Sequence, residues 1–214
     1  MKRGLEKEHE TIDPPRQRTL YARDVDLIPF RLEDADETYH GWLNDDEVIE
    51  YLEVRFADRS MAALRTYVNS VIADPNRYFY LVKHRQTGKR IGTVSFTVNP
   101  IHLTVNWGYL IGDHEFWGTG ISLQVQIPIF DFAFGELGAR RFYGGAFIEN
   151  IRSQFNLRRL GFIKEGVFRK HYRKAVGSEE FTDIVYYALL AEEWQSIRTK
   201  FDKFRIPPDN APQS

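Results

Sequence analysis

Three strand-like runs follow one another in the middle of the chain, between residues 77 and 113. They read RYFYLVKH, RIGTVSFTV and IHLTVNWGYLIGD, and the connections between them are RQTGK and Asn99-Pro100. Runs rich in β-branched and aromatic residues, joined by short polar turns, are typical of antiparallel hairpins. The sequence therefore predicts a three-stranded meander, which commits the centre of the fold to an antiparallel sheet.

Helix-like and strand-like segments flank this meander on both sides. Helices are predicted at 32–45, 59–74, 121–137 and 149–161, and further strands at 25–30, 140–148, 162–173 and 181–190. Ser60 is a suitable N-cap for the second helix and Gly161 a suitable C′ residue for the fourth. Pro128 lies inside the third helix and is expected to kink or shorten it. We expect a mixed α/β fold, of the α+β kind, with a mostly antiparallel sheet.

The length and composition indicate one domain with loosely held ends. A chain of 214 residues, 43% of them hydrophobic, is long enough to bury a sizeable core. Residues 1–24 are polar and residues 205–214 are Pro-rich, so we expect two tails around a folded domain at 25–204. The N-terminus lacks the apolar segment of a secretory signal, and no apolar run approaches the ~18 residues of a membrane helix. We expect a cytoplasmic protein.

Charge and cysteine content exclude several classes of function. The sequence has no cysteine, which excludes disulfides, thiolate zinc sites and a cysteine nucleophile, and we expect no metal. The formal net charge of -1 gives no overall attraction to nucleic acid or to an anionic membrane. The basic run RRLGFIKEGVFRKHYRK fits either an RNA- or ribosome-binding surface or a solvated face. The absence of a second basic cluster favours the solvated face, so no nucleic-acid partner is expected.

A glycine-containing loop, EFWGTGIS at 115–122, joins the meander to the third helix. It lacks the lysine of a P-loop and the third glycine of a dinucleotide fingerprint. In one interpretation, Gly118 and Gly120 only permit a turn with positive φ. In the other, their backbone amides and the following helix N-terminus bind a pyrophosphate, for which no lysine is needed.

The loop resembles the acyl-CoA loop of the GNAT acetyltransferases, whose core pattern is Gln/Arg-x-x-Gly-x-Gly/Ala. Gly120 matches the glycine of that pattern, whereas Trp117 replaces Gln/Arg and Ser122 replaces Gly/Ala. The form W-G-x-G is usual in the RimJ/RimL-like branch. The segments FRLEDADETYHGWLNDDEVIEYL, ENIRSQFNLRRLGF and EEFTDIVYYALLAEEW resemble other parts of that branch, in the same order. The resemblance covers about residues 26–196.

The resemblance implies a GNAT-like sheet with splayed middle strands, helices on both faces and acetyl-CoA as co-substrate. The cofactor would lie between VNWGYLI and RFYGGAFI, and its amide-bearing arm would pair with backbone like an added strand. The implied contacts to this arm are Tyr109, Leu110, Ile111 and Asn150. The implied contacts to the pyrophosphate are the amides of Trp117, Gly118, Thr119, Gly120, Ile121 and Ser122. Arg158 would meet the 3′-phosphate.

The resemblance also implies direct attack of an amine on the thioester, with a backbone N–H binding the oxyanion. Many members carry Glu two residues before the Gly-Tyr of the first splayed strand, where this chain has Asn106. Asn106 cannot accept a proton but can orient a water or the acceptor, so it is kept among the candidate catalytic residues. Many carry an acidic Tyr seven residues after the motif's Asn, where this chain has Leu157. Ser153 is expected to hydrogen-bond the sulfur. Glu149 is the best-placed base, and the other candidates are His102, His114 and Glu115.

The lack of a strong base bears on the acceptor. An α-amino group with a pKa of about 7.8 is roughly a quarter neutral near pH 7.4, whereas a lysine amine is neutral only about one part in a thousand. We therefore expect an N-acetyltransferase acting on a protein N-terminus or a small amine. A nucleotide-linked amino sugar is an alternative, because aromatic residues could flank it: Trp42, Tyr51, Trp107, Tyr109 and Trp117. A catalytically silent acyl-CoA-binding module is the rival from another class, favoured by Asn106 and Leu157. Both a monomer and a homodimer remain open.

Overall fold

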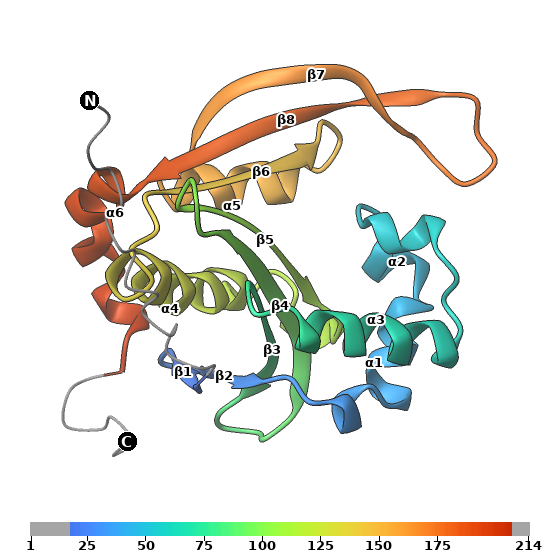
Figure 1. Ribbon diagram of the computed structural model, residues 1–214, viewed down its shortest axis with the longest axis horizontal. Helices are drawn as coiled ribbons and strands as arrows, with labels where there is room; N and C mark the ends of the chain where they lie inside the picture. The colour runs from blue at the N-terminus through green and yellow to red at the C-terminus, as the bar shows by residue number, and fades with distance from the viewer. Residues whose placement is uncertain (1–17, 207–214) are drawn as a thin grey trace, which may run out of the picture.

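The computed structural model describes residues 18–206, which form one mixed sheet with helices on both of its faces (Figure 1). The eight strands lie in the order β1-β2-β3-β4-β5-β6-β8-β7, and only β5 and β6 run parallel to each other. The strands are β1 (Leu20–Tyr21), β2 (Val25–Pro29), β3 (Arg77–His84), β4 (Arg90–Asn99), β5 (Thr104–Ile111), β6 (Arg141–Phe147), β7 (Ile163–Arg173) and β8 (Phe181–Leu190). The α-helices are α1 (Glu37–Leu43), α2 (Asp46–Ile49), α3 (Met61–Ala73), α4 (Ile121–Gly135), α5 (Ile151–Arg159) and α6 (Ala191–Ile197). The 3-10 helices are η1 (Leu32–Asp34), η2 (Glu53–Phe56), η3 (His114–Phe116) and η4 (Arg198–Phe204).

The predicted meander is confirmed as β3, β4 and β5, which pair antiparallel in sequence order. Local chemistry explains the ends of the neighbouring helices. The Ser60 hydroxyl accepts a hydrogen bond from the Ala63 amide, at 3.2 Å, and so caps α3. Gly161, with φ of +90°, takes the left-handed conformation that ends α5. These are the two cap residues that the sequence predicts.

One predicted helix is wrong, and the shortening expected at Pro128 is not seen. The single helix predicted at 32–45 is divided into η1 and α1, and α2 begins just beyond it, because Asp36 and Asp45 each act as an N-cap and start a new helix. The Asp36 carboxylate accepts from the Thr38 amide at 3.0 Å, which requires a non-helical backbone at Asp36 itself. Pro128 does not shorten the third helix, since α4 continues through it to Gly135.

Two separate hydrophobic cores lie on the two faces of the sheet. On one face, α4, α5 and α6 pack on the central strands, with Phe130 and Trp194 fully buried. On the other face, α1, α2 and α3 pack on β3 and the end of β5 around Phe79 and Leu110. Figure 1 shows α4 and the group α1–α3 on opposite sides of the strands. Residues on alternate sides of β5 therefore belong to different cores.

The ends of the described chain are tied to this body. Strand β1 begins at Leu20, within the segment expected to be a tail, and pairs with β2. Arg205, near the start of the expected C-terminal tail, forms an ion pair with Asp131 at 2.9 Å. The remaining parts of both predicted tails, residues 1–17 and 207–214, lie outside the described residues. Between residues 18 and 206, no helix has the length and apolar character needed to cross a membrane.

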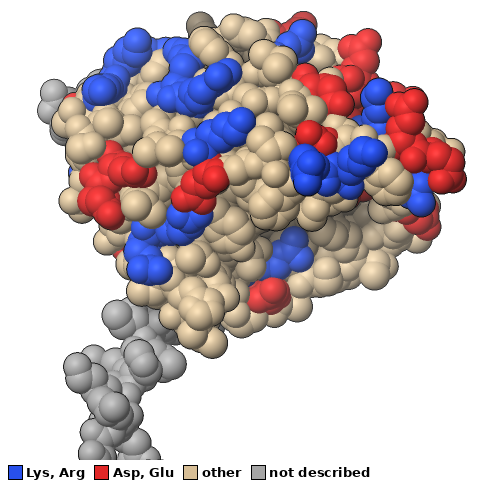
Figure 2. Space-filling view, turned by 90° about the horizontal axis from the view of Figure 1, so that it is seen from above, with Lys and Arg blue, Asp and Glu red and all other residues tan. Residues whose placement is uncertain are grey.

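Basic and acidic side chains are interspersed on the face of the molecule that Figure 2 shows. Glu165, an acidic residue within the basic run, pairs with Arg141 of β6, which lies beyond β8 in the sheet order. Lys174, at the end of that run, pairs with Glu180 at 3.2 Å. The basic run thus has an acidic residue within it and an acidic partner at its end.

Candidate active site

The two middle strands separate after only three residue pairs. Strand β5 pairs with β6 at Thr104–Arg141, Val105–Phe142 and Asn106–Tyr143. The two strands do not pair with each other along the rest of their length. The second half of β5 keeps its partner β4 as far as Ile111, and β6 keeps β8 as far as Phe147. The edges that face one another are therefore left with unpaired backbone groups, which an extended ligand can pair with. The predicted splay is confirmed.

Asn106 lies at the point where the strands separate. Its side-chain amide donates a hydrogen bond to the Tyr143 carbonyl on β6, at 3.0 Å. The residue is exposed, and its side-chain amide connects β5 to β6 where the two strands separate. This contact holds the Asn106 side chain between the two strands.

A cavity of about 410 Å³ fills the opening between β5 and β6. Residues 107–111 of β5 and 144–147 of β6 form two of its walls, and α5 contributes a third. Among the residues predicted for the cofactor arm and the sulfur, Tyr109, Leu110, Ile111, Asn150 and Ser153 all line this cavity. The edge of β5, the start of α5 and Ser153 therefore line the same cavity.

Helix α5 begins at this cavity with a capping interaction. Asn150 is its N-cap and accepts a hydrogen bond from the Ser153 amide, at 2.9 Å. The Asn150 carbonyl oxygen is thereby engaged, whereas its NH₂ group and the Ser153 hydroxyl make no hydrogen bond within the described part of the chain. Leu157 is buried and lines the same cavity, so no hydroxyl is present at that position.

Gln154 is a buried residue that the sequence analysis did not single out. Its side-chain nitrogen donates to the carbonyls of Phe147, at 3.2 Å, and Ile148, at 2.8 Å. Its side-chain oxygen accepts from the Tyr187 hydroxyl at 3.1 Å. These bonds fix the end of β6 to α5. Both polar atoms of the buried amide are hydrogen-bonded, as expected for buried polar groups. Most residues of α5 are polar, so nothing in the sequence distinguishes Gln154.

The glycine loop has the geometry of an anion site. Gly118 and Gly120 have φ of +76° and +84°, and a Cβ added at either position would meet no atom within 4 Å. Gly120 is the N-cap of α4 and offers no side chain to the first helical amides. The amides of residues 118–122 have no hydrogen-bond acceptor among residues 18–206. Five free donors at the start of a long helix, with open space before them, suit a phosphate.

Side chains around the loop hold it against β5. The Trp117 indole donates to the Ile111 carbonyl at 2.8 Å, and the Thr119 hydroxyl donates to the Phe116 carbonyl at 2.8 Å. The Asn156 amide donates to the Ser122 hydroxyl at 3.2 Å. Burial raises the pKa of the Tyr109 phenol, against the opposing effect of hydrogen bonds with Asn156 and Ser122, so Tyr109 stays protonated. Strand, loop and α5 are thus linked by polar contacts.

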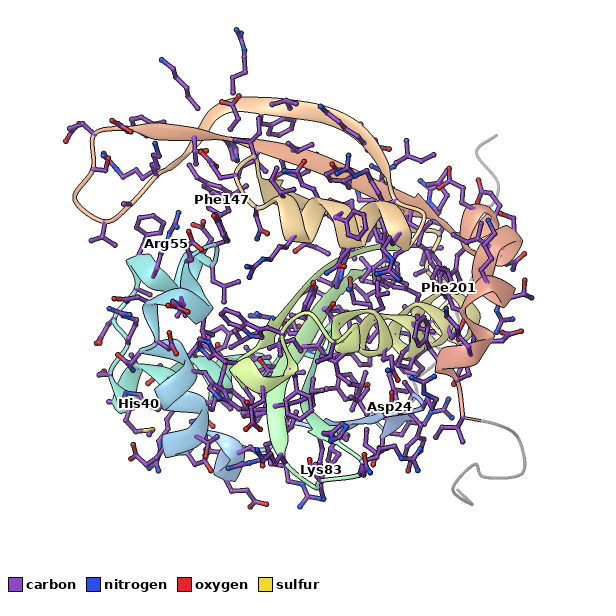
Figure 3. All side chains as sticks on the ribbon, turned by 180° about the vertical axis from the view of Figure 1, so that it is seen from behind. Asp24, His40, Arg55, Lys83, Phe147 and Phe201 are labelled. Atoms are coloured by element: carbon purple, nitrogen blue, oxygen red, sulfur yellow. The ribbon has the colours of Figure 1, made fainter. Side chains whose placement is uncertain are left out.

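Glu149 lies in a neighbouring cavity of about 870 Å³ rather than in the opening itself. The Thr182 hydroxyl lies 2.7 Å from both of its carboxylate oxygens. This cavity separates α2 and η2 from the β7–β8 hairpin, and Arg55 bridges the two sides. Its guanidinium stacks 4.7 Å from the centre of the Phe147 ring and donates to the Arg173 carbonyl at 3.3 Å (Figure 3).

Several other predicted residues lie away from the cavities. The Arg158 guanidinium donates to the Gln154 carbonyl of its own helix at 3.3 Å. His114 contacts the Asp45 carboxylate at 2.9 Å, and Glu115 pairs with Lys89. His102 lies in the exposed turn before β5. The five aromatic residues predicted to flank an amino sugar lie in different places. Trp42 is in the core, where its ring leaves no room for a Cβ at residue 112, and Trp117 anchors the loop. Tyr51, Trp107 and Tyr109 line the cavity in the opening.

A third cavity, of about 750 Å³, lies on the opposite face of β5 under α3. It shares Leu52, Glu53 and residues 108–110 with the cavity in the opening. Arg152 and Tyr172 also line the opening. The sequence analysis did not select Glu53, Arg152 or Tyr172, because they come from segments far apart in sequence that only the folded chain brings together.

Comparison with known proteins agrees with this geometry. The sequence model for the acetyltransferase (GNAT) domain matches residues 24–163. The uncharacterized N-acetyltransferase YoaA of Bacillus subtilis is 26% identical over 151 residues, which are 68% of this chain and 84% of YoaA.

Two solved structures share the fold. One is spermidine N-acetyltransferase from Vibrio cholerae in complex with CoA and spermine, with a TM-score of 0.71 and 20% identity, covering 80% of this chain and 98% of that one. The other is RimL, a ribosomal L7/L12 α-N-protein acetyltransferase in complex with CoA, with a TM-score of 0.71 and 19% identity, covering 81% of this chain and 98% of that one. With the matched family model, the splayed strands and the glycine loop, the chain belongs to the GNAT acetyltransferase family and is an N-acetyltransferase.

Proposed function

We propose that this protein transfers the acetyl group of acetyl-CoA to a primary amine, either a protein N-terminus or a small molecule. The opening between β5 and β6 carries the proposal, because it combines unpaired strand edges with five free amides at the start of α4. The strand edges suit the amide-bearing arm of the cofactor, and the free amides suit its pyrophosphate.

The reaction we propose is a direct attack. The neutral amine nitrogen forms a bond to the thioester carbon, and the tetrahedral oxyanion is stabilised by a backbone N–H of the opened strand. The carbon–sulfur bond then breaks, the nitrogen loses a proton, and CoA leaves as a thiolate that takes up a proton. A thiolate is a tolerable leaving group at neutral pH, because thiols have a pKa of about 8.5. The free hydroxyl of Ser153 in this cavity is suited to hydrogen-bond the sulfur.

The class of acceptor amine is inferred from the groups that the site offers for proton removal. Asn106 is engaged with the Tyr143 carbonyl and cannot accept a proton, so a site of this kind favours an amine that is already partly neutral. The fold itself serves both acceptor classes, since one structural neighbour is a spermidine acetyltransferase and another an α-N-protein acetyltransferase. A nucleotide-linked amino sugar remains the alternative, supported by Tyr51, Trp107 and Tyr109 on the cavity wall.

An assay of thiol release across a panel of amines tests the proposal. We expect acetyl-CoA-dependent release that rises with pH in proportion to the neutral fraction of the amine. Mass spectrometry of the product confirms where the acetyl group has gone. Tight CoA binding without release for any amine would instead establish a silent acyl-CoA-binding module.

A further inference from the structure

The cavity under α3 has a wall of apolar and aromatic side chains. It lies between α3 and the sheet face made by β3, β4 and β5, on the side of the sheet opposite to α4. Tyr39, Leu43, Leu64, Phe79 and Leu110 supply buried apolar surface, and Tyr67 supplies a ring that is 42% exposed. A concave site of this size and character is typical of a pocket for an apolar small group.

The cavity meets the opening at a glycine. Gly108 lies in the middle of β5, where a Cβ would meet no atom within 4 Å, and it lines both cavities. A glycine inside a strand weakens the sheet and often marks the close approach of a ligand. Gly108 thus places no side chain between the two cavities that it lines. A group in the cavity under α3 can therefore reach the edge of β5 at which the cofactor arm is expected.

Glu53 is the charged residue available at this junction. Three charged residues line the cavity under α3: Glu53, Asp58 and Arg59. The Asp58 carboxylate accepts from the Ser60 amide at 2.8 Å, and Arg59 pairs with Asp46 at 3.1 Å. Glu53 makes no hydrogen bond or ion pair with any residue that the structure describes, and it lines both cavities. A free carboxylate between the two spaces is suited to receive an ammonium group.

We propose that the cavity under α3 binds the apolar body of the acceptor, so that the natural substrate is a primary amine on a hydrophobic or aromatic group. Glu53 receives the amine at the junction, and Gly108 lets it reach the thioester. This inference rests on the proposed function for the chemistry, but the binding itself does not require turnover. The same chemistry is offered by a small arylalkylamine and by a protein whose first residue is large and apolar.

A matched pair of amines tests the cavity directly. Phenylalaninamide and serinamide carry the same α-amino amide and differ only in the side chain. We expect kcat/KM to favour phenylalaninamide by about tenfold or more, given the free energy of burying a phenyl ring. Calorimetric titration of both amides into the CoA complex should show the same preference. 2-Phenylethylamine and a peptide beginning with Phe then distinguish the small-molecule source from the protein source.

Variants of α3 link the preference to the cavity. Ala63 lines the cavity, whereas Ala62 beside it is exposed and does not. Ala63→Phe should abolish the preference for phenylalaninamide, and Ala62→Phe should keep it. Ser70→Phe, from a second lining position, should repeat the effect of Ala63→Phe. Glu53→Gln should lower kcat/KM for both amides alike and leave their ratio unchanged. CoA affinity equal to that of the unaltered protein shows that each variant is folded.

The outcomes separate this inference from the proposed function. The cavity assignment is overturned, while acetyl transfer stands, if the enzyme uses both amides equally or prefers serinamide. It is also overturned if Ala63→Phe and Ser70→Phe keep the full preference for phenylalaninamide. Absence of CoA binding overturns the proposed function, and the amide titrations are then made on the free protein with the same variants. Failure of every apolar amine to bind in either form also overturns the assignment.

Discussion

The two sides of β5 are built in different ways. On the side of the opening and the glycine loop, the groups available to a ligand are mainly backbone: strand edges at 107–111 and 144–147, and free amides at 118–122. On the side under α3, the ligand would meet side chains, among them Tyr39, Tyr67 and Phe79. A site made of backbone depends on chain conformation, whereas a site made of side chains depends on residue identity. The cofactor side should therefore respond to changes of backbone geometry and the acceptor side to changes of volume.

The largest expected effect comes from the loop. Gly120→Val places a β-branched side chain at φ of +84° and in the open space before α4. Backbone strain and the loss of one or two charge-assisted hydrogen bonds to phosphate should weaken CoA binding by about 100-fold or more. Calorimetry with CoA measures this.

The control for this variant is Gly138→Val. Gly138 also has positive φ, +65°, and open space around its Cβ, but it lies beyond the C-terminal end of α4. It should cost similar stability and leave CoA affinity unchanged. Equal CoA affinities for Gly120→Val and the unaltered protein would refute the phosphate assignment.

A smaller effect is expected from Ser153→Ala. The Ser153 hydroxyl lines the opening without a protein partner, and one neutral hydrogen bond to the sulfur contributes about 1–2 kcal/mol. We expect kcat to fall by roughly 5–30-fold with little change in CoA affinity. Single-turnover kinetics under saturating acetyl-CoA isolates this step. An unchanged kcat would leave Ser153 with a packing role only.

A still smaller effect is expected from Glu149→Gln. Glu149 is held by Thr182 in the cavity beside the β7–β8 hairpin, away from the opening. We expect a loss of less than tenfold in kcat/KM, below the ~10²–10⁴ of a general base. A greater loss with CoA and amine binding intact would place the acceptor in the cavity of Glu149, and not in the cavity under α3.

The smallest expected effect separates two roles of Asn150. Asn150→Ala removes the cap of α5 and should lower stability by about 1 kcal/mol. Asn150→Asp keeps a capping oxygen but loses the NH₂ group, so stability should be retained while CoA affinity falls severalfold, as expected for about one lost hydrogen bond. Thermal unfolding and calorimetry are measured on both variants. Unchanged CoA affinity in Asn150→Asp would leave Asn150 as a cap alone.

The side of the opening and the glycine loop could be predicted from sequence because its determinants are local. The meander, the loop at 115–122 and the start of α5 each occupy one short segment, so periodicity, glycine placement and capping chemistry point to them. Ser60 and Gly161 were found for the same reason. The breaks that separate η1, α1 and α2 were missed, because Asp36 and Asp45 act as caps within a region whose apolar spacing is helical throughout.

The acceptor side could not be predicted in this way. Its cavity joins residues of α1, η2, α3, β3, β4 and β5, and the sequence predicts the pairing of the three strands but not how the helices lie on them. Glu53 carries no motif in the sequence, and its position between two cavities is what distinguishes it. The hydrogen bond from Asn106 to the Tyr143 carbonyl could not be predicted either. It depends on the register of a parallel pair formed by strands distant in sequence.

Amide hydrogen exchange with and without CoA tests the central claim most directly, because it reports on backbone groups. Residues 107–111 and 118–122 should gain protection on CoA binding, together with the start of α5, while α3 (Met61–Ala73) should remain unchanged. Protection confined to α3 and η2, with no change at 107–111 or 118–122, would contradict the account.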